Sequence, residues 1–333
     1  MNEIKRLPYL DRVRTLCILG LFPFHVADYY SDSRFALKTG VIIPWLNYLY
    51  HFFYQWRLAL LFMIAGISAV RAIEKYGESQ FFKEKLKRIF VPLILGSILL
   101  VTPQVYIERL QEGSFQGNFW EFLPDSMKGT YPEGNRSWGH LWFLFYLFFY
   151  SVVYCGFASR ISKLTPKFYW WSFPILVEIF LRPYFPSFPN FVTDLANLLV
   201  FGFYFFMGTL FFKSSFSAIE KHQNLFLGFA ILLLIISPLI ESNLILALRT
   251  LCMVLVGVTM TRGWNQAPGK LLNYFKNANY SLYVIHHTVI IILAYFLVHS
   301  LSPTIFFLVV TGLSFLISLL LYEAYRQCKV RLK

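Results

Sequence analysis

The chain has 333 residues, of which 57% are hydrophobic, 20% aromatic and only 14% charged. A mean hydropathy of +0.55 excludes an ordinary soluble domain and indicates an integral membrane protein. The formal net charge of +13 does not indicate nucleic-acid binding, because the basic residues lie between long apolar runs. The four cysteines are widely spaced, so neither a zinc site nor a disulfide framework is predicted.

Ten apolar windows approach the length of about 20 residues with which a helix crosses a bilayer. They lie at 13–30, 45–71, 89–108, 139–158, 169–182, 193–212, 224–240, 243–261, 278–299 and 303–325. The second is long enough to be broken or tilted. Most of the 30 Lys and Arg residues fall in connections that a cytoplasmic N-terminus would place inside. We therefore predict an all-α polytopic bundle of about 10 transmembrane helices, with both termini in the cytoplasm.

The first window contains two residues that are costly in hydrocarbon, Arg14 near its start and His25 near its end. Eleven residues at 100° each return to within about 20° of the starting direction and rise roughly 16 Å, so both side chains lie on one helical face. Asp28 follows one turn later, where a carboxylate can fix the imidazole tautomer and raise its basicity. The structural alternative is that Arg14 only anchors the helix and His25 only bonds a neighbouring helix.

Further polar residues stand inside apolar windows. The candidates are Arg57 in the second window, His140 and Trp142 at the start of the fourth, and Tyr280, Tyr283 and His286 in the ninth. Spacings of three residues place the last three on roughly one stripe. A buried arginine, an aromatic belt and interhelical bonds are the structural alternatives. Glu178 and Arg249 fall at similar depths, which favours a structural ion pair between them.

The stretch ESQFFKEKLKRIF alternates apolar residues with Lys83, Lys85, Lys87 and Arg88. One interpretation is an interfacial helix that faces acidic lipid, and the other is a landing site for an anionic cofactor. No P-loop, GxSxG, HExxH or CxxC element is present. A histidine-based site that uses no metal is therefore the best candidate for chemistry.

Four segments together resemble the membrane acyltransferase-3 family. LDRVRTLCILGLFPFH is similar to its opening span, in which ten residues separate an arginine from a histidine, here Arg14 and His25. FYQWRLALLFMIAGISA, GHLWFLFYLF and NANYSLYVIHHTVI are similar to its second-span arginine element, its His-Leu-Trp-Phe-Leu element and its Tyr-x-x-Tyr-x-x-His element. Ala59 and Ala65 depart from a common proline and serine. Since the landmarks run from about residue 7 to 325, a single transmembrane domain over 1–333 with no appended soluble domain is expected.

The resemblance implies an enzyme that transfers an acyl group, acetyl or succinyl, from cytoplasmic acyl-CoA to a hydroxyl of an extracytoplasmic glycan. RIFVPLILGSILLVTPQVYIERL is similar to the branch of glucan-modifying proteins, which place succinyl groups on extracytoplasmic glucans. The resemblance implies that His25 is the base or acyl carrier and that Asp28 orients it. The residues implied to bind the donor are Arg14, Arg57, Lys83, Lys85, Lys87 and Arg88. Those implied to line the acceptor site or tunnel are His140, Trp142, Tyr280, Tyr283 and His286. The expected location is the cytoplasmic membrane of a bacterium.

Two other functions fit part of the pattern. A proton-coupled secondary transporter would also use buried Arg, Glu and His, although carriers usually contain an internal repeat, and none is visible in this sequence. A non-catalytic membrane component of an envelope assembly is the third hypothesis, and replacement of Arg14 or His25 without a phenotype would favour it.

Overall fold

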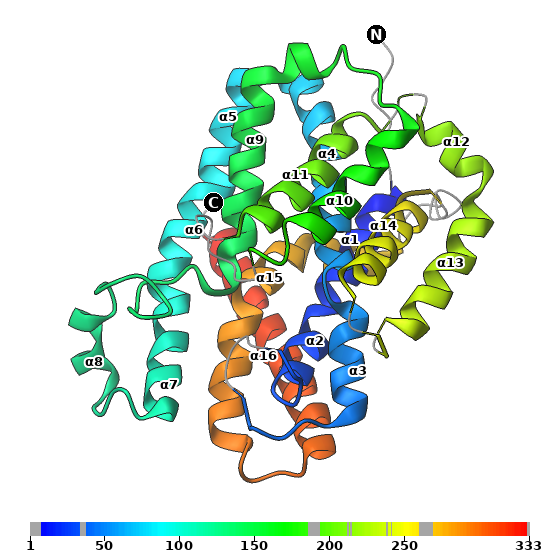
Figure 1. Ribbon diagram of the computed structural model, residues 1–333. Helices are drawn as coiled ribbons and strands as arrows, with labels where there is room; N and C mark the ends of the chain where they lie inside the picture. The colour runs from blue at the N-terminus through cyan, green and yellow to red at the C-terminus, as the bar shows by residue number, and fades with distance from the viewer. Residues whose placement is uncertain are drawn as a thin grey trace. The chain divides into compact units, whose positions relative to one another are not determined.

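The computed structural model describes residues 8–33, 38–185, 194–211, 213, 215–237, 239–240, 242–259 and 269–331. Within them the chain is helical, apart from turns and an isolated bridge between Thr130 and Arg136, which confirms the predicted all-α class. The α-helices (Figure 1) are α1 (Pro8–Leu19), α2 (Leu21–Asp28), α3 (Pro44–Phe53), α4 (Trp56–Tyr76), α5 (Glu78–Lys85), α6 (Val91–Gly96), α7 (Thr102–Glu112), α8 (Phe119–Phe122), α9 (Trp142–Ile161), α10 (Phe173–Phe180), α11 (Leu195–Thr209), α12 (Ser215–Lys221), α13 (Gln223–Ile236), α14 (Asn243–Thr259), α15 (Lys270–Leu297) and α16 (Pro303–Arg331). Between them lie the π-helical segments η1 (Leu86–Phe90) and η2 (Ser97–Val101) and the 3-10 segments η3 (Leu123–Asp125), η4 (Gly139–Leu141) and η5 (Phe168–Ser172).

In the described part of the chain, five helical runs are long and apolar enough to cross a membrane: Pro44–Tyr76, Glu78–Glu112, Gly139–Ile161, Lys270–Leu297 and Pro303–Arg331. The shorter apolar helices α11, α13 and α14 coincide with three more predicted windows. On α16, Ser314 and Ser318 are buried while Leu308, Leu316 and Leu320 are exposed, the polarity expected where lipid is the solvent. The chain is therefore an integral membrane protein. The count of about 10 crossings stays a prediction, as does the side of the termini, whose residues 1–7 and 332–333 lie outside the described residues.

The second predicted window is broken between α3 and α4. Gln55, directly before α4, has a φ of 64°, a left-handed conformation that costs a residue with a side chain about 1–3 kcal/mol. Its side-chain amide donates a hydrogen bond of 2.6 Å to Glu178, which holds the residue in place. As a result Arg57 lies in the first turn of α4, directly after this break.

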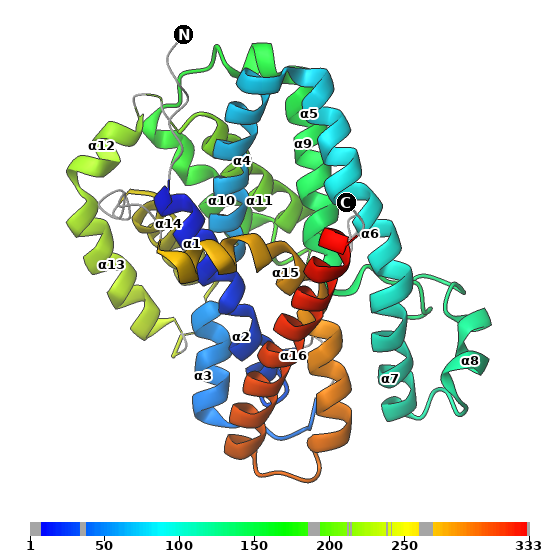
Figure 2. The same ribbon diagram turned by 180° about the vertical axis from the view of Figure 1, so that it is seen from behind.

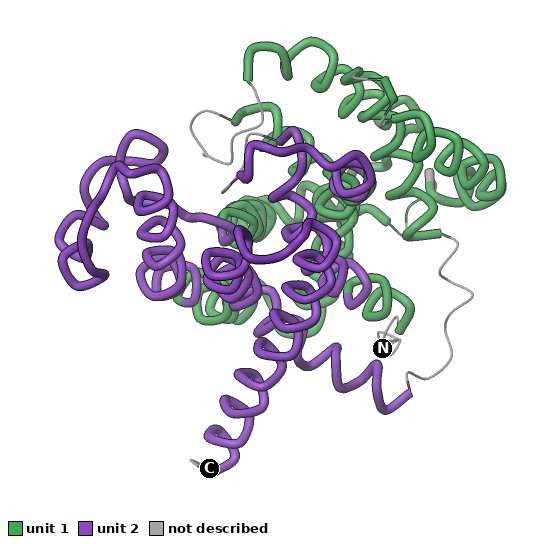
Figure 3. Tube along the Cα trace, turned by 90° about the horizontal axis from the view of Figure 1, so that it is seen from below, with its two compact units in different colours: residues 1–14, 52–91, 142–268 green, residues 15–51, 92–141, 269–333 purple. Residues whose placement is uncertain are grey.

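The chain divides into two compact units (Figure 3). Unit 1 consists of residues 1–14, 52–91 and 142–268. Within it α4 and α11 approach closely at two glycines: a Cβ on Gly66 would lie 1.9 Å from the carbonyl oxygen of Phe205, and one on Gly208 would lie 2.1 Å from that of Met63. Such contact between backbones requires glycine and is typical of helix pairs in membranes.

Unit 2 consists of residues 15–51, 92–141 and 269–333. Its helices α15 and α16 lie side by side, and α2 contacts both (Figure 2). α8 lies beside α7, where Asn118 and Glu121 form a capping box at the start of α8. Arg109 of α7 donates hydrogen bonds to the side chain of Asn135 at 3.0 Å and to the carbonyl of Gly134 at 2.9 Å. The connection from α7 to η4 is thus tied back onto α7.

Candidate active site

Four histidine rings from three segments of unit 2 lie against one another and are called the histidine cluster below. They are His25 of α2, His140 of η4, and His286 and His287 of α15. The ring centroid of His25 lies 4.5 Å from that of His287 and 5.2 Å from that of His286, and the ring of His140 lies 5.2 and 5.3 Å from the same two. His25 is half-buried, whereas the other three are at most 5% exposed. Three predicted site residues thus converge, with His25 the most accessible.

A glycine and a tyrosine set the position of His140. Gly139 has a φ of 46°, and a Cβ there would lie 2.8 Å from a methyl group of Val101, so a larger residue would be both strained and crowded. The hydroxyl of Tyr283 donates a hydrogen bond of 2.7 Å to the carbonyl oxygen of His140 and joins η4 to α15. Tyr283, one of the predicted residues, is therefore part of the framework of the histidine cluster.

The side-chain amide of Gln104, on α7, connects the histidine cluster to its surroundings. Its Nε2 lies 3.2 Å from Nδ1 of His140 and 2.7 Å from Oγ1 of Thr288, and its Oε1 lies 2.9 Å from Nδ1 of His287. The other ring nitrogen of His140 lies 2.9 Å from the carbonyl oxygen of Val284. A neutral side-chain amide and a backbone carbonyl therefore bond these two rings. Among the described residues, no group of His, Cys, Asp and Glu is arranged to hold a metal ion.

The sequence analysis did not predict His287, Gln104 or Thr288. Successive residues on a helix normally point in different directions, so a site at His286 gives no reason to include His287. The only signal for Gln104 is a polar residue within the third apolar window. Its bond to His287 joins residues 183 positions apart, a pairing that helical periodicity does not predict.

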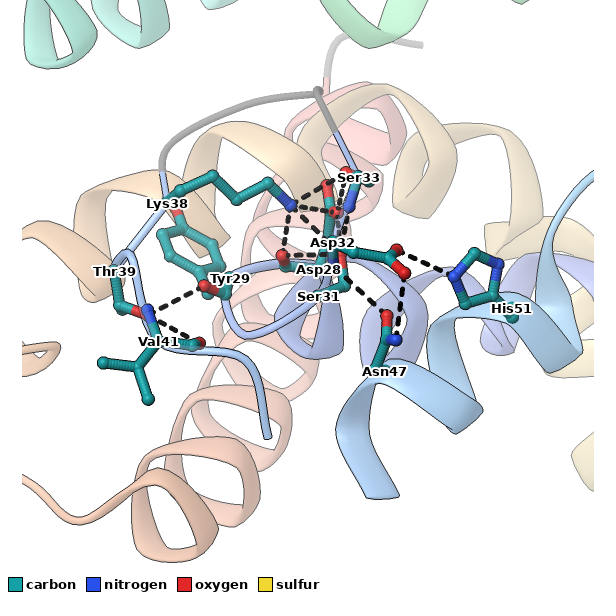
Figure 4. A network of polar contacts seen from close by, with 10 residues as sticks. All are labelled: Asp28, Tyr29, Ser31, Asp32, Ser33, Lys38, Thr39, Val41, Asn47 and His51. Atoms are coloured by element: carbon teal, nitrogen blue, oxygen red, sulfur yellow. Dashed lines mark hydrogen bonds and ion pairs between the residues drawn. The ribbon is translucent and has the colours of Figure 1, made fainter. Parts of the chain in front are cut away.

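The carboxylate of Asp28 is buried in a polar network at the end of α2 (Figure 4). Nζ of Lys38 lies 2.5 Å from Oδ1 of Asp28, and the hydroxyls of Ser31 and Ser33 donate to the same oxygen. Lys38 also donates to the backbone carbonyl of Asp28. Asp28 therefore ties down the chain that follows α2, while its predicted role in orienting His25 stays a prediction.

A second carboxylate in Figure 4, Asp32, is more exposed. Nε2 of His51 lies 2.8 Å from Oδ1 of Asp32, and the amide of Asn47 donates to Oδ2 at 3.1 Å. Burial alone would raise the pKa of Asp32. The hydrogen bonds from Asn47 and His51, with the charge of His51, outweigh burial and hold the pKa below its usual value.

Arg14, the first predicted donor-binding residue, lies on α1. Its guanidinium donates a hydrogen bond of 3.1 Å to the hydroxyl of Ser68 and lies 3.4 Å from the carboxylate of Asp11. Lys85 is half-buried and close enough to Arg14 and Arg88 to interact with both charges. Arg14 and Lys85 thus concentrate positive charge in unit 1.

The other basic residues of the 78–90 stretch are more exposed. Lys83 and Lys87 face outward, and Arg88 forms an ion pair of 2.6 Å with Glu84. The stretch is continuous with the helical run Glu78–Glu112. Within this stretch, Lys85 is therefore half-buried, whereas Lys83, Lys87 and Arg88 are exposed.

Three further predicted residues have different surroundings. Arg57 is 2% exposed, and its guanidinium lies 6.0 Å from the ring centroid of Phe53. Trp142 packs within unit 1 against Tyr146, at 5.2 Å between ring centroids. Tyr280 is 42% exposed on α15, unlike the buried Tyr283. Their roles toward donor or acceptor stay predictions.

The structure corrects the ion pair expected between Glu178 and Arg249. Nε and Nη2 of Arg182 each lie 2.9 Å from an oxygen of Glu178, and Nη1 of Arg182 lies 3.2 Å from Asp194. Arg182 is one helical turn after Glu178, so it reaches the carboxylate more directly. Arg249 instead donates a hydrogen bond of 2.7 Å to the hydroxyl of Ser237. Glu178, Arg182 and Asp194 are called the ion network below.

Comparison with known proteins supplies the family. A family model described as an acyltransferase domain matches residues 7–323. "Glucans biosynthesis protein C" of Salmonella schwarzengrund (strain CVM19633) is 25% identical over 95% of this chain and 91% of its own length. The protein of the same name from Escherichia coli (strain SMS-3-5 / SECEC) is 24% identical over 98% and 93%. No solved structure matches. Since the family model covers nearly the whole chain, the protein belongs to the acyltransferase-3 family.

Proposed function

We propose that the protein is a membrane O-acyltransferase that moves an acetyl or succinyl group from acyl-CoA to a hydroxyl of an extracytoplasmic glycan, with His25 as the catalytic base. The observation that carries this proposal is the convergence of His25, His140 and His286 in one cluster. Acyl transfer to a hydroxyl needs a group that accepts a proton near neutral pH, and imidazole is the side chain best suited to this. Family membership supports the same reaction class.

In the proposed reaction, His25 removes the proton from the acceptor hydroxyl as its oxygen attacks the thioester carbonyl. A carbon–oxygen bond forms, the carbon–sulfur bond breaks, and the proton on the imidazolium passes to the departing thiolate. A donor group near the carbonyl stabilises the oxyanion. An acyl-histidine intermediate on His25 would use the same residue as nucleophile, and trapping of a labelled acyl group on the protein distinguishes the two routes.

For the donor, Arg14 and Lys85 are the strongest candidates to bind the phosphates of CoA. The two positive charges interact, and an anionic group between them would relieve their repulsion. Lys83, Lys87 and Arg88 are weaker candidates because they are exposed, and Arg57 is a candidate for the acyl tunnel.

For the acceptor, a glucan is the first candidate because the two relatives named above are called glucans biosynthesis protein C. Trp142 and Tyr280 supply aromatic rings of the kind that stack on sugar faces, and Tyr280 is the more exposed of the two. Asp28 is proposed to act on His25 from the end of α2.

The test is release of CoA from acetyl-CoA and succinyl-CoA by purified protein in nanodiscs, with and without an oligosaccharide acceptor. His25→Ala should lower transfer by about 10²–10⁴-fold. Arg14→Ala should raise the KM for acyl-CoA. His299→Ala and Arg326→Ala, at exposed positions, are the matched controls. Near-normal transfer by the folded His25→Ala variant would refute the proposed base.

A proton-coupled transporter is the competing function, since the ion network buries two carboxylates in unit 1. Both carboxylates are bonded to Arg182, a pairing more typical of structure than of proton release. Uptake by proteoliposomes that depends on a pH gradient, with no CoA release, would favour the transporter.

A further inference from the structure

The hydrogen bonds of His140 fix which of its nitrogens carries the proton. Its Nε2 faces the carbonyl oxygen of Val284, which only accepts hydrogen bonds, so Nε2 must carry a hydrogen. An isolated charge is costly in a buried site, so the ring is neutral and its Nδ1 is an acceptor. Nδ1 therefore requires a donor, and the NH2 group of Gln104 lies 3.2 Å away. The same NH2 group donates to the carbonyl oxygen of Leu100 at 3.0 Å and to Oγ1 of Thr288 at 2.7 Å, and because the carbonyl only accepts, Nε2 must face this side.

The orientation of the Gln104 amide in turn determines the tautomer of His287. With its NH2 group toward His140, Gln104 must present its carbonyl oxygen Oε1 to Nδ1 of His287, 2.9 Å away. Because Oε1 only accepts, Nδ1 of His287 carries the hydrogen. The remaining nitrogen of His287, Nε2, then holds a lone pair and is the basic atom of that ring.

His287 is also the ring nearest to His25 in the histidine cluster. Their centroids are 4.5 Å apart and their planes meet at 67°. The titratable groups that face His287 are His25 from α2, His140 from η4 and His286 from its own helix. The carboxylate of Asp28 is instead bonded by Lys38, Ser31 and Ser33. The nearest base to His25 with a defined lone pair is therefore another neutral imidazole.

We propose that His287 is the proton-relay partner of His25, and that Gln104 is the positioning residue that keeps His287 in its accepting tautomer. The proposal rests on the acyl transfer proposed above. After His25 has accepted the proton of the acceptor hydroxyl, it passes a proton to Nε2 of His287. The positive charge is thereby shared between the two rings. The proton returns through His25 to the thiolate as the carbon–sulfur bond breaks, and no proton is gained or lost.

The first test is His287→Asn. The asparagine amide nitrogen occupies the position of Nδ1 and keeps the bond to Gln104, but the variant has no base in place of Nε2. The kcat for CoA release in the transfer assay should fall about 10²-fold, with the KM for acyl-CoA unchanged. His299→Asn is the control for the same substitution at an exposed position of unit 2. A folded His287→Asn variant with the kcat of the wild type would overturn the relay.

The second test needs no activity. In protein labelled with ¹⁵N-histidine, the His287 signals, assigned by their loss in His287→Asn, should report a hydrogen on Nδ1 and a bare Nε2. Gln104→Met, which removes the amide contacts to His140 and His287, should produce a mixture of tautomers. A hydrogen on Nε2 of His287 in the wild type would refute the positioning role, whatever the transfer assay gives. Conversely, the predicted tautomer without transfer in any assay would count against the proposed function.

Discussion

The ion network of unit 1 and the histidine cluster of unit 2 both contain buried polar atoms, but different kinds of group bond those atoms. In the first, Arg182 meets the carboxylates of Glu178 and Asp194. In the second, His140 and His287 meet a backbone carbonyl and the amide of Gln104. Moving a proton in the ion network would unbalance opposite charges, whereas an imidazole can exchange one with a neighbouring imidazole. The first arrangement preserves a structure, and the second suits chemistry.

Removing the cation of the ion network should have the largest effect on stability. Arg182→Met leaves Glu178 and Asp194 buried without their counterion, and breaking such a pair costs about 3–5 kcal/mol. The thermal unfolding midpoint in detergent should fall sharply. Arg326→Met, at an exposed pair with Glu323, should cost no more than about 1 kcal/mol. Equal midpoints for the two variants would mean that the ion network is not a structural element.

The buried pair of Asp28 and Lys38 extends the comparison to unit 2. Asp28→Asn removes the charge from a carboxylate that accepts several hydrogen bonds, which should cost about 1.5–3 kcal/mol by the same unfolding measurement. A loss of transfer larger than the loss of folded protein would support the orienting role of Asp28. Loss of stability alone would assign Asp28 to the framework.

Gly139 tests how far the histidine cluster depends on its backbone. Gly139→Ala places a methyl group 2.8 Å from Val101 at a φ of 46°, and we expect a cost of about 1–3 kcal/mol. Gly228→Ala on α13 is the control, because no atom lies within 4 Å of its added Cβ. Since His140 is the next residue, the transfer rate should fall in Gly139→Ala and not in the control. Unchanged transfer would mean that catalysis does not depend on the position of His140.

The two regions also differ in how well the sequence predicted them. Apolar windows predicted the helices because lipid requires the backbone to bond to itself, and the length of the second window indicated its break. His25, His140 and His286 were selected because each is a polar residue inside an apolar window, and the structure brings their rings together. Gln104 and His287 were missed, and Arg182 was not recognised as the partner of Glu178. The contact between Gln104 and His287 depends on tertiary packing, and Arg182 lies in a turn at the end of an apolar window. Neither arrangement produces a periodic pattern in the sequence.

The smallest effect is expected at the exposed pair of Asp32 and His51, which completes the series from buried to exposed charges. The pKa of Asp32 lies below its usual value in the folded protein, so the ionised carboxylate stabilises the fold. This stabilisation is complete above the ordinary pKa, near pH 4, and is lost as the pH falls through the lowered pKa. Solvent screens such a pair, so its contribution at pH 7 is below about 1 kcal/mol. Asp32→Asn should therefore lower the unfolding midpoint slightly at pH 7, and this difference should disappear in acid. A difference between wild type and variant that grows below pH 4 would contradict the assigned direction. It would mean that burial, and not the bonds from Asn47 and His51, controls this carboxylate.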